Sequence, residues 1–337
     1  MKIEPTLLLN CSEVEQLLSL ADCINVVERV FRLQGEGRLR PVGILGTKTC
    51  NGGLHVKTAS LMAERSYLVA KLNTNFPKNR QRCGLPTIQG VIVIYDAENG
   101  RALAILDSIN ITIKRTAAAT AVAAKYLARK DSSVATICGC GDQGRAQLRA
   151  LHLMLPLAKV YAFDVNQNAS ARFATEFLRE LKIDMELVGD LPSAIRKSDV
   201  IVTCTTATEF FLREEDVAPG SFIAAIGADD AHKKEIDPAL IASTKVVADN
   251  REQICSIGDT HHAVRQGLMA KDDLYAELSE IVAGQKRGRT SHDEIIIFDS
   301  TGVAIEDAAA AVIVFEKALT AGLGNHFEFA AKEGNVR

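Results

Sequence analysis

The 337-residue sequence lacks the features that would assign it to a membrane, secreted or nucleic-acid-binding class. No apolar run reaches the roughly 18 residues that a transmembrane helix needs. The opening stretch MKIEPTLLLNCSEVE has no small-residue cleavage site, so we expect an ordinary start and not a signal peptide. A net charge of −3 gives no basic excess for nucleic acid or an anionic membrane. We therefore expect a small-molecule partner, and neither nucleic acid nor a membrane.

The sequence also has no C-x-x-C pair, although it contains eight cysteines. Several cysteines sit inside apolar runs such as VTCTT, where a thiol packs as a small hydrophobic group. Their scattered spacing disfavours a zinc site, and we expect no bound metal. Free thiols of this kind are typical of a cytoplasmic protein.

Internal repeats, low-complexity tracts and long linkers are absent too, and the length suggests two domains. The first third of the chain is rich in short strand-like runs separated by breakers. Little helical periodicity separates these runs, which predicts an antiparallel sheet. The expected strands cover residues 54–62, 67–73, 88–96 and 101–107.

From residue 110 the pattern changes to an alanine-rich helix, 110–128, and then to strands that alternate with helices. This alternation predicts a doubly wound parallel sheet. A last helix over 303–322 could pack back on the first domain. The expected strands cover 134–139, 160–164, 199–205, 222–228, 245–250 and 294–300, with helices over 144–154 and 169–181.

Three glycines form the pattern G-x-G-x-x-G in the stretch ATICGCGDQGRAQ. The pattern alone is weak, because turns with three glycines are common, but here a strand precedes it and a helix follows it. Gly139 can make the tight turn, Gly141 lets the backbone approach a pyrophosphate, and Gly144 permits close packing of helix on strand. The free N–H groups of the helix would then bind phosphate. These features favour a dinucleotide site over a purely structural turn.

Asp164 ends the next expected strand, 20 residues after Gly144. A carboxylate at this place accepts hydrogen bonds from a ribose diol. It would repel the 2′-phosphate of NADP, and no Arg or Lys follows before Arg172. The sequence therefore predicts NAD as the cofactor.

Several charged residues stand in apolar or strand-end surroundings. Lys71 lies in YLVAKLN, where it either snorkels from a strand end or faces a substrate carboxylate. Arg115 lies near the start of the alanine-rich helix and either binds a carboxylate or covers the helix surface. His55 and Lys57 alternate on one strand and so share a face, which lines a site or is merely solvated.

Asp229 follows the run FIAAIGA, which places it at the carboxyl end of a parallel strand, where doubly wound folds bind ligands. A helix N-cap is the alternative role for its side chain. The pair His261–His262 follows SIGDT and is interpreted as a loop feature with little part in substrate binding.

Taken together, these residues resemble the ornithine cyclodeaminase/μ-crystallin family over nearly the whole chain. The resemblance is carried by the motifs K71-L-N-T-N-F-P77-K-N79, G84-L-P-T87, K114-R115-T116-A-A-A, Y126-L-A-R, I137-C-G-C-G-D-Q143, I226-G-A-D229, K233-K-E-I-D237 and I297-F-D-S300-T-G302-V-A-I-E-D307. It implies an α/β fold, with a Rossmann-type doubly wound parallel sheet and a smaller α+β domain built on an antiparallel sheet. The implied domains are 1–120 for substrate binding and dimerisation, 121–305 for NAD binding, and 306–337 as a C-terminal helix that returns to the first domain.

The resemblance also assigns the residues around the cofactor. Asp142 and Gln143 contact the pyrophosphate, and Asp164 holds the adenosine ribose. The full cofactor set is Thr87, Arg115, Gly139, Gly141, Asp142, Gln143, Gly144, Asp164, Thr205, Ile226, Gly227, Ala228, Lys233 and Ser300.

For the reaction itself, the resemblance makes Asp229 the acid/base, with Lys71 as a second catalytic residue. The substrate-binding set is Arg115, Lys71, Lys57, Arg40 and Thr301. Family members are similar in being dimers that join the antiparallel sheets of two subunits, so we expect a homodimer.

The sequence departs from the family pattern at two places. Many members carry Arg or Lys after a proline in the first domain, where this chain has Gly43 in R40-P-V-G43-I-L. Arg40, His55 and Lys57 are the candidates to replace that cation. Asp229 is followed by D-A-H-K233 and not by a Pro-Gly-Lys turn, so we expect a loop of a different shape.

The resemblance leaves three functions open. The first is an NAD(H)-dependent imine reductase or amino-acid dehydrogenase, acting for example on Δ1-pyrroline-2-carboxylate or on pyruvate plus ammonia. The alternative is an ornithine or lysine cyclodeaminase, which needs a polar or acidic pocket for a distal ammonium. We expect no carboxylate near Lys71 and Lys57 to supply one, apart from Asp230 in the loop after Asp229. A non-catalytic crystallin-like binding protein is the third, which the presence of Asp229 disfavours.

Overall fold

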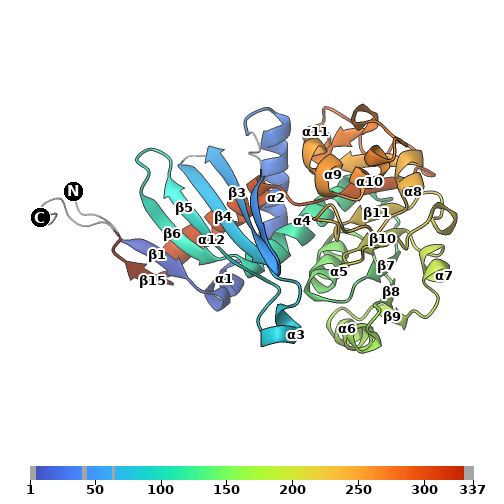
Figure 1. The fold of residues 1–337 in the computed structure, drawn as a ribbon, viewed down its shortest axis with the longest axis horizontal. Helices are drawn as coiled ribbons and strands as arrows, with labels where there is room; N and C mark the ends of the chain where they lie inside the picture. The colour runs from blue at the N-terminus through green and yellow to red at the C-terminus, as the bar shows by residue number, and fades with distance from the viewer. Residues whose placement is uncertain (1–4, 40–43, 63–64, 330–337) are drawn as a thin grey trace, which may run out of the picture. The chain divides into compact units, whose positions relative to one another are not determined.

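The computed structural model describes residues 5–39, 44–62 and 65–329, and the chain divides into two compact units (Figure 1). Unit 1 comprises Met1–Val30, Gly37–Arg115 and Val303–Arg337, and unit 2 comprises Phe31–Glu36 and Thr116–Gly302. The mixed α/β fold with two different sheets confirms the predicted fold class. Among the described helices, none has the length and apolar character that crossing a membrane would require.

Unit 1 is built on a seven-stranded sheet in the order β15-β1-β6-β5-β4-β3-β2. The predicted antiparallel pairing is confirmed from β3 to β6. The strand β2, which was not predicted, pairs antiparallel with β3, and β1 pairs with β6 in parallel. The strands are β1 (Thr6–Leu9), β2 (Ile44–Thr49), β3 (Gly52–Met62), β4 (Ser66–Asn75), β5 (Ile88–Asp96), β6 (Ala102–Asp107) and β15 (Asn325–Phe327).

The long helix α12 (Ala304–Ala321) lies across one face of this sheet, as the ribbon shows (Figure 1). Alternate residues of β4 point to that face and are buried, namely Tyr67, Val69, Lys71 and Asn73. The Tyr67 hydroxyl hydrogen-bonds a carboxylate oxygen of Glu316 on α12 at 3.1 Å. The other helices with residues in unit 1 are α1 (Cys11–Leu17), α2 (Leu20–Gly35), α3 (Asn79–Cys83) and α4 (Ile109–Leu127).

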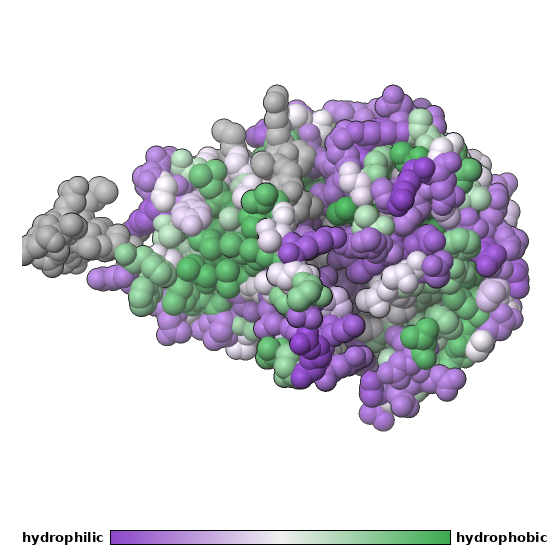
Figure 2. All heavy atoms as spheres, viewed as in Figure 1, coloured by the Kyte–Doolittle hydropathy of each residue, from purple (hydrophilic) through white to green (hydrophobic). Residues whose placement is uncertain are grey.

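The opposite face of the same sheet carries an apolar row that no described element of unit 1 covers. The row runs in register through Leu45, Val56, Leu72 and Val91 on four neighbouring strands. Leu45 is 72% exposed and Val91 40% exposed. Apolar residues gather over these strands in the space-filling view (Figure 2). An apolar surface of this kind is typical of an interface.

Unit 2 is built on an eight-stranded sheet in the order β13-β12-β14-β11-β10-β7-β8-β9. All neighbouring strands of this sheet pair in parallel, which confirms the predicted doubly wound sheet. The chain reverses its direction of winding between β7 and β10, and ligands of such folds bind at this place. The strands are β7 (Val134–Cys138), β8 (Lys159–Phe163), β9 (Asp184–Leu187), β10 (Val200–Thr203), β11 (Phe222–Ala225), β12 (Lys245–Ala248), β13 (Ala276–Glu277) and β14 (Ile296–Asp299).

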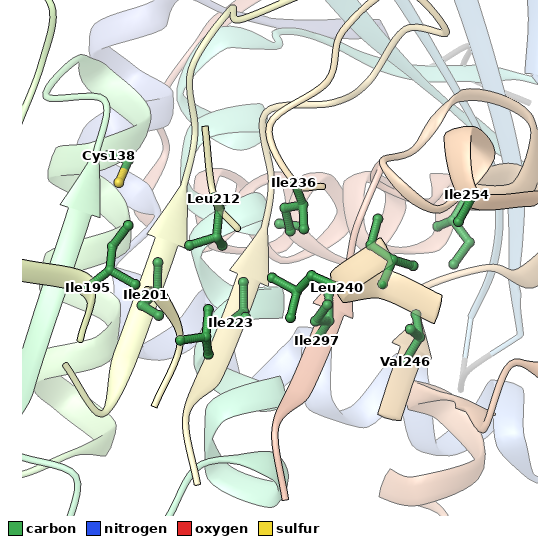
Figure 3. Packing of buried hydrophobic residues seen from close by; sticks show 14 of the residues in the cluster. Cys138, Ile195, Ile201, Leu212, Ile223, Ile236, Leu240, Val246, Ile254 and Ile297 are labelled. Carbon is green, nitrogen blue, oxygen red and sulfur yellow. The ribbon is translucent and has the colours of Figure 1, made fainter. Parts of the chain in front are cut away.

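A buried hydrophobic cluster joins one face of this sheet to its helices (Figure 3). Ile201, Ile223 and Ile297 project from three neighbouring strands, and Leu240 and Ile254 from two helices meet them. Most of α4, from Thr116 onward, belongs to unit 2. The α-helices that lie wholly in unit 2 are α5 (Asp142–Met154), α6 (Gln167–Glu180), α7 (Leu191–Ile195), α8 (Pro238–Ser243), α9 (Arg251–Ile257), α10 (Thr260–Arg265) and α11 (Leu278–Val282).

Candidate active site

The glycine loop connects β7 to α5, as the sequence predicts. Gly139 has a φ of +102°, a conformation that L side chains rarely adopt, and its N–H donates to the Phe163 carbonyl at 2.9 Å. An ideal Cβ on Gly144 would lie 2.0 Å from the Gly139 carbonyl oxygen. Glycine is therefore required at both positions for the turn and for the packing of helix on strand.

The start of α5 is open to a ligand. Gly141 is the N-cap, no side chain caps the first turn, and an ideal Cβ on Gly141 would meet no atom within 4 Å. The Oε1 atom of Gln143 is buried and has no hydrogen-bond partner in the described structure. Exposed N–H groups at a helix N-terminus attract phosphate. These residues therefore fit the pyrophosphate of a dinucleotide.

Asp164 lies directly after β8, with both carboxylate oxygens bound to backbone. One oxygen accepts the Cys140 N–H at 2.9 Å and the other accepts the Asn166 N–H at 2.8 Å. These bonds fix the carboxylate beside the glycine loop. The side chain of the next residue, Val165, is 94% exposed.

The predicted cofactor residues of unit 2 follow one another along the carboxyl edge of its sheet. Asp164 follows β8, the glycine loop follows β7, Thr205 follows β10 and Gly227 follows β11, and these four strands are neighbours in that order. Adjacent strands are about 4.8 Å apart. An elongated ligand that places its adenosine at β8 and its pyrophosphate at β7 therefore extends toward β10 and β11.

Asp229 lies in a turn after β11 and is tied to Lys233. The Lys233 ammonium contacts Asp229 Oδ1 at 2.5 Å and donates to the Gly227 carbonyl at 3.1 Å. The Asp229 side chain is 42% exposed, so it is accessible from solvent. No helix begins at this residue, and the alternative role as an N-cap is wrong.

His261 and His262 lie in helix α10, so their assignment to a loop is wrong. The Nε2 atom of His262 is 2.8 Å from the Lys233 carbonyl oxygen. Burial, opposed in part by this contact, lowers the pKa of His262. His262 therefore supports the segment that follows Asp229.

Ser300 and Thr301 follow β14 and are bound to polar side chains of unit 2. The Ser300 hydroxyl donates to Asp249 at 3.0 Å, and the Thr301 hydroxyl accepts from the Gln253 amide at 2.6 Å. Thr87 belongs to unit 1, where its carbonyl accepts the Phe76 N–H at 2.8 Å. Arg40 and Gly43 lie outside the described residues.

Unit 1 contains a buried cluster of charges on β4, α4 and α12. The Lys71 ammonium lies 2.6 Å from Asp307, and Arg115 contacts Asp307 at 2.9 Å and Glu306 at 2.8 Å. The side chains of Lys71 and Asp307 are only 4% and 1% exposed, and that of Glu306 is 0% exposed. The alternatives of a snorkelling lysine and a surface arginine are therefore wrong.

Lys57 adds a third positive charge to this cluster, since it pairs with Lys71 in the register of β3 and β4. Burial lowers the pKa of Lys71 to about 7; Asp307 opposes this shift, and Arg115 and Lys57 add to it. Lys71 can therefore gain or lose a proton near neutral pH. His55 lies on the same face of β3 as Lys57, as expected, and both are half-buried.

The expectation of no carboxylate near Lys71 is wrong, because Glu306 and Asp307 both reach the cluster. Two acids in the apolar run VAIEDAAAAVIV are the signal in the sequence, since buried acids need a cation. Among the described residues, three cations and two carboxylates meet in this cluster, an excess of one positive charge. That charge suits a single carboxylate of a ligand.

Sequence reasoning also missed three buried acids of unit 2. Glu235, Asp259 and Asp299 are each at most 1% exposed, and no ion pair is found for them among the described residues. Burial comes first among the causes that raise the pKa of all three. The acids of unit 1 differ, because Asp307 and Glu306 form ion pairs with Lys71 and Arg115.

In the described part of the chain, no group of His, Cys, Asp and Glu could hold a metal ion.

Comparison with known proteins confirms the resemblance drawn from the motifs. Residues 4–322 match the family described as the ornithine cyclodeaminase/mu-crystallin family. A similar protein is the alanine dehydrogenase of Archaeoglobus fulgidus, which is 37% identical over 324 residues, or 96% of this chain and 98% of that protein.

Solved structures share the fold over nearly their full lengths. An archaeal alanine dehydrogenase dimer with bound NAD has a TM-score of 0.93 at 37% identity, covering 96% of this chain and 99% of that one. The Δ(1)-pyrroline-2-carboxylate reductase of Thermococcus litoralis, in complex with NADH and L-proline, has a TM-score of 0.91 at 34% identity, covering 95% and 100%. A lysine cyclodeaminase has a TM-score of 0.86 at 28% identity, covering 98% and 97%. The chain belongs to the ornithine cyclodeaminase/mu-crystallin family.

Proposed function

We propose that the chain is an NAD(H)-dependent imine reductase or amino-acid dehydrogenase. It interconverts a small 2-imino acid, or a cyclic ketimine acid, with the corresponding L-amino acid. Reduction of Δ1-pyrroline-2-carboxylate to proline and conversion of pyruvate plus ammonia to alanine are the two model reactions. The observation that carries the proposal is the buried cluster of unit 1, whose described residues hold one more positive than negative charge and so match one carboxylate. Similar proteins named for both reactions support it.

NAD(H) is the proposed cofactor, and the solved relatives that hold NAD or NADH support this choice. Gly141 and the first turn of α5 would hold its pyrophosphate, and Asp164 its adenosine ribose. Because Asp164 would repel a 2′-phosphate, we expect a much higher kcat/KM with NADH than with NADPH. The Asp164→Ser variant should have a smaller ratio of kcat/KM with NADH to kcat/KM with NADPH. Equal kcat/KM values for the two cofactors in the unaltered protein would contradict the assignment.

In the proposed mechanism NADH supplies the hydride when it is bound, and the chain orients and polarises the substrate. Lys71 and Arg115 bind the substrate carboxylate and hold the reacting carbon in one orientation, a proximity effect. Asp229 gives the proton to the imine nitrogen or removes it from the amine. Lys233, which touches Asp229 and the Gly227 carbonyl, keeps this carboxylate in place.

A cyclodeaminase remains the second candidate, supported by the fold shared with a lysine cyclodeaminase and by the two acids in unit 1. A diamino acid needs a carboxylate for its distal ammonium. Asp307 is already shared between Lys71 and Arg115, and Glu306 contacts Arg115. A second ammonium would therefore raise a charge that is already positive, which favours the reductase.

The decisive experiment follows NADH oxidation with a panel of cyclic imino acids and of 2-oxo acids with ammonia. We expect consumption of one NADH per imino acid reduced. With catalytic NAD and L-ornithine or L-lysine, we expect little release of ammonia. Steady conversion of ornithine to proline without added reductant would overturn the choice and establish the cyclodeaminase. Tight NADH binding without turnover of any substrate would favour the crystallin-like alternative.

We propose a homodimer formed through the apolar row Leu45–Val56–Leu72–Val91, which the dimer reported for a relative supports. The proposed domains are 1–120 for substrate and dimer contacts, 121–305 for NAD, and 306–337 as a returning helix. We also propose the cytoplasm as the compartment, since all eight cysteines are free thiols. Light scattering of a Leu72→Glu variant tests the interface, and a variant that stays dimeric would contradict it.

A further inference from the structure

Glu235 lies in the segment after the Asp229 turn and binds two loops at once. Its Oε1 atom accepts the Thr205 N–H and the Thr205 hydroxyl, both at 2.6 Å. Its Oε2 atom accepts the Gly227 N–H at 2.9 Å. Thr205 follows β10 and Gly227 follows β11, so one buried carboxylate joins the ends of two neighbouring strands.

Close packing at Gly227 shows how tightly this carboxylate fits. An ideal Cβ on Gly227 would lie 2.5 Å from Glu235 Oε2 and 2.6 Å from Oε1. Any side chain at this position would displace the carboxylate, because real Cβ atoms do not approach so near. Glycine at 227 is therefore a condition for the contact with Glu235.

The same contact extends to the Asp229 turn. The Gly227 carbonyl accepts the Asp229 N–H at 3.1 Å and the Lys233 ammonium at 3.1 Å. Glu235 holds Gly227 by its N–H, and Gly227 holds the turn by its carbonyl. A shift of the Glu235 carboxylate would therefore move both the backbone after β11 and the turn that carries Asp229.

Glu235 is itself held in place from behind. Its own N–H and that of Ile236 donate to Asp259 Oδ1 at 2.7 and 3.1 Å. Within the described residues no cation pairs with Glu235, and its carboxylate accepts hydrogen bonds from the N–H groups of Thr205 and Gly227 and from the Thr205 hydroxyl. An ionised carboxylate accepts hydrogen bonds through both oxygens and can make all of these contacts. In a Gln side chain one oxygen is replaced by an NH2 group, which would face one of the donors and could not accept its bond.

We propose that Glu235 is a positioning residue that shapes the loops after β10 and β11 for the nicotinamide half of the cofactor. This inference rests on the proposed use of NAD(H). The adenosine half is held elsewhere, by Asp164 and the glycine loop after β8 and β7. Loss of the Glu235 carboxylate should therefore weaken binding of the nicotinamide half of the cofactor and leave binding of the adenosine half unchanged.

The test compares binding of NADH with binding of ADP-ribose, which lacks the nicotinamide, by calorimetry on the full chain. In Glu235→Gln the Kd of NADH should rise about three- to tenfold, the range of one hydrogen bond, while the Kd of ADP-ribose stays within about twofold. Glu235→Asp keeps the charge on a shorter side chain and should show a smaller selective rise. If the Gln variant does not fold, the Asp variant decides by the same criterion.

Asp216→Asn is the matched control, because Asp216 is a buried acid of unit 2 that pairs with Arg196 at 2.6 Å and has no hydrogen bond to Thr205 or Gly227 among the described residues. Its variant should bind both ligands with unchanged affinity. Equal changes for NADH and ADP-ribose in the Glu235 variants, or no change for either, would overturn the proposal. The proposed reaction can fail separately, because these binding measurements need no turnover.

Discussion

Asp307 in unit 1 and Asp299 in unit 2 are the same residue type and are equally buried, each about 1% exposed. Their pKa values nevertheless shift in opposite directions. Burial alone would raise the pKa of Asp307, but Arg115 and Lys71 outweigh it and lower the value. Burial raises the pKa of Asp299 to about 6, and Glu235 adds to the rise while bonds from Thr260 oppose it.

This difference reflects two uses of buried charge. In unit 1 the described acids pair with Lys71 and Arg115, and we propose that the positive charge of this cluster receives a ligand carboxylate. In unit 2 the buried acids accept backbone N–H groups and so organise loops. The charges of unit 2 that we propose to act on ligands are Asp164 and Asp229, which are more exposed.

The largest expected effect separates the two candidate proton carriers, Asp229 in unit 2 and Lys71 in unit 1. Asp229→Asn keeps the shape but removes the ionisable group, so turnover should fall by roughly 10²–10⁴-fold, as for a general acid–base residue. Binding of NADH should barely change. The measurement is steady-state turnover alongside NADH affinity. Near-normal turnover in this variant would remove Asp229 from the mechanism and leave Lys71 as the candidate.

The second prediction concerns a substitution that removes the ion pairs of Asp307 in unit 1. Asp307→Asn leaves Lys71 and Arg115 with less compensation in a buried site, which should lower the free energy of unfolding by about 3–5 kcal/mol. The control is Asp22→Asn, because Asp22 pairs with Lys317 at 2.6 Å where both side chains are more than a third exposed. That change should cost at most about 1 kcal/mol. Equal losses in denaturant unfolding would show that the buried cluster is no more important than a surface pair.

The third prediction concerns pH and unit 2. Because the folded-state pKa of Asp299 is raised from 3.8 to about 6, its contribution to stability is present below pH 3.8 and lost as the pH rises to about 6. The titration of Asp299 should therefore lower the free energy of unfolding by roughly 2–3 kcal/mol as the pH rises from 3.8 to about 6. Asp299→Asn should remove most of that fall, and Asp22→Asn should leave it. An unchanged pH profile in Asp299→Asn would assign the fall to another acid.

Much of the fold could be predicted from the sequence, because alternating strands and helices after residue 110 have few architectures open to them. The span 88–96 expected for a strand matches β5 in full. The parallel pairing of β1 with β6 could not be predicted, since it joins Leu7–Leu9 to residues almost a hundred positions later. Local patterns carry no information on such a pairing.

The site was predicted less completely. The glycines and Asp164 have fixed spacings, so sequence was enough to bring them together. The partners of Lys71 and Arg115 could not be assigned, because Glu306 and Asp307 are about 190 residues from Arg115. The role of Glu235 could not be predicted for another reason. Glu235 follows Lys233 and Lys234, which suggests a local ion pair, whereas its carboxylate binds backbone N–H groups.

The smallest expected effect concerns Lys71 in unit 1. It tests whether the positive charge of Lys71 binds the substrate carboxylate. The pKa of Lys71 is about 7, so its positive charge is present below that pH and lost as the pH rises through it. The kcat/KM for an imino acid, which reports the free enzyme, should therefore fall above pH 7, by up to tenfold for each pH unit. Arginine stays charged throughout, so in Lys71→Arg the fall should move to higher pH. Lys317→Arg is the control, since Lys317 pairs with Asp22 on an exposed surface and should leave the profile unchanged. A fall that persists in Lys71→Arg would assign the titration to another group and remove Lys71 from carboxylate binding.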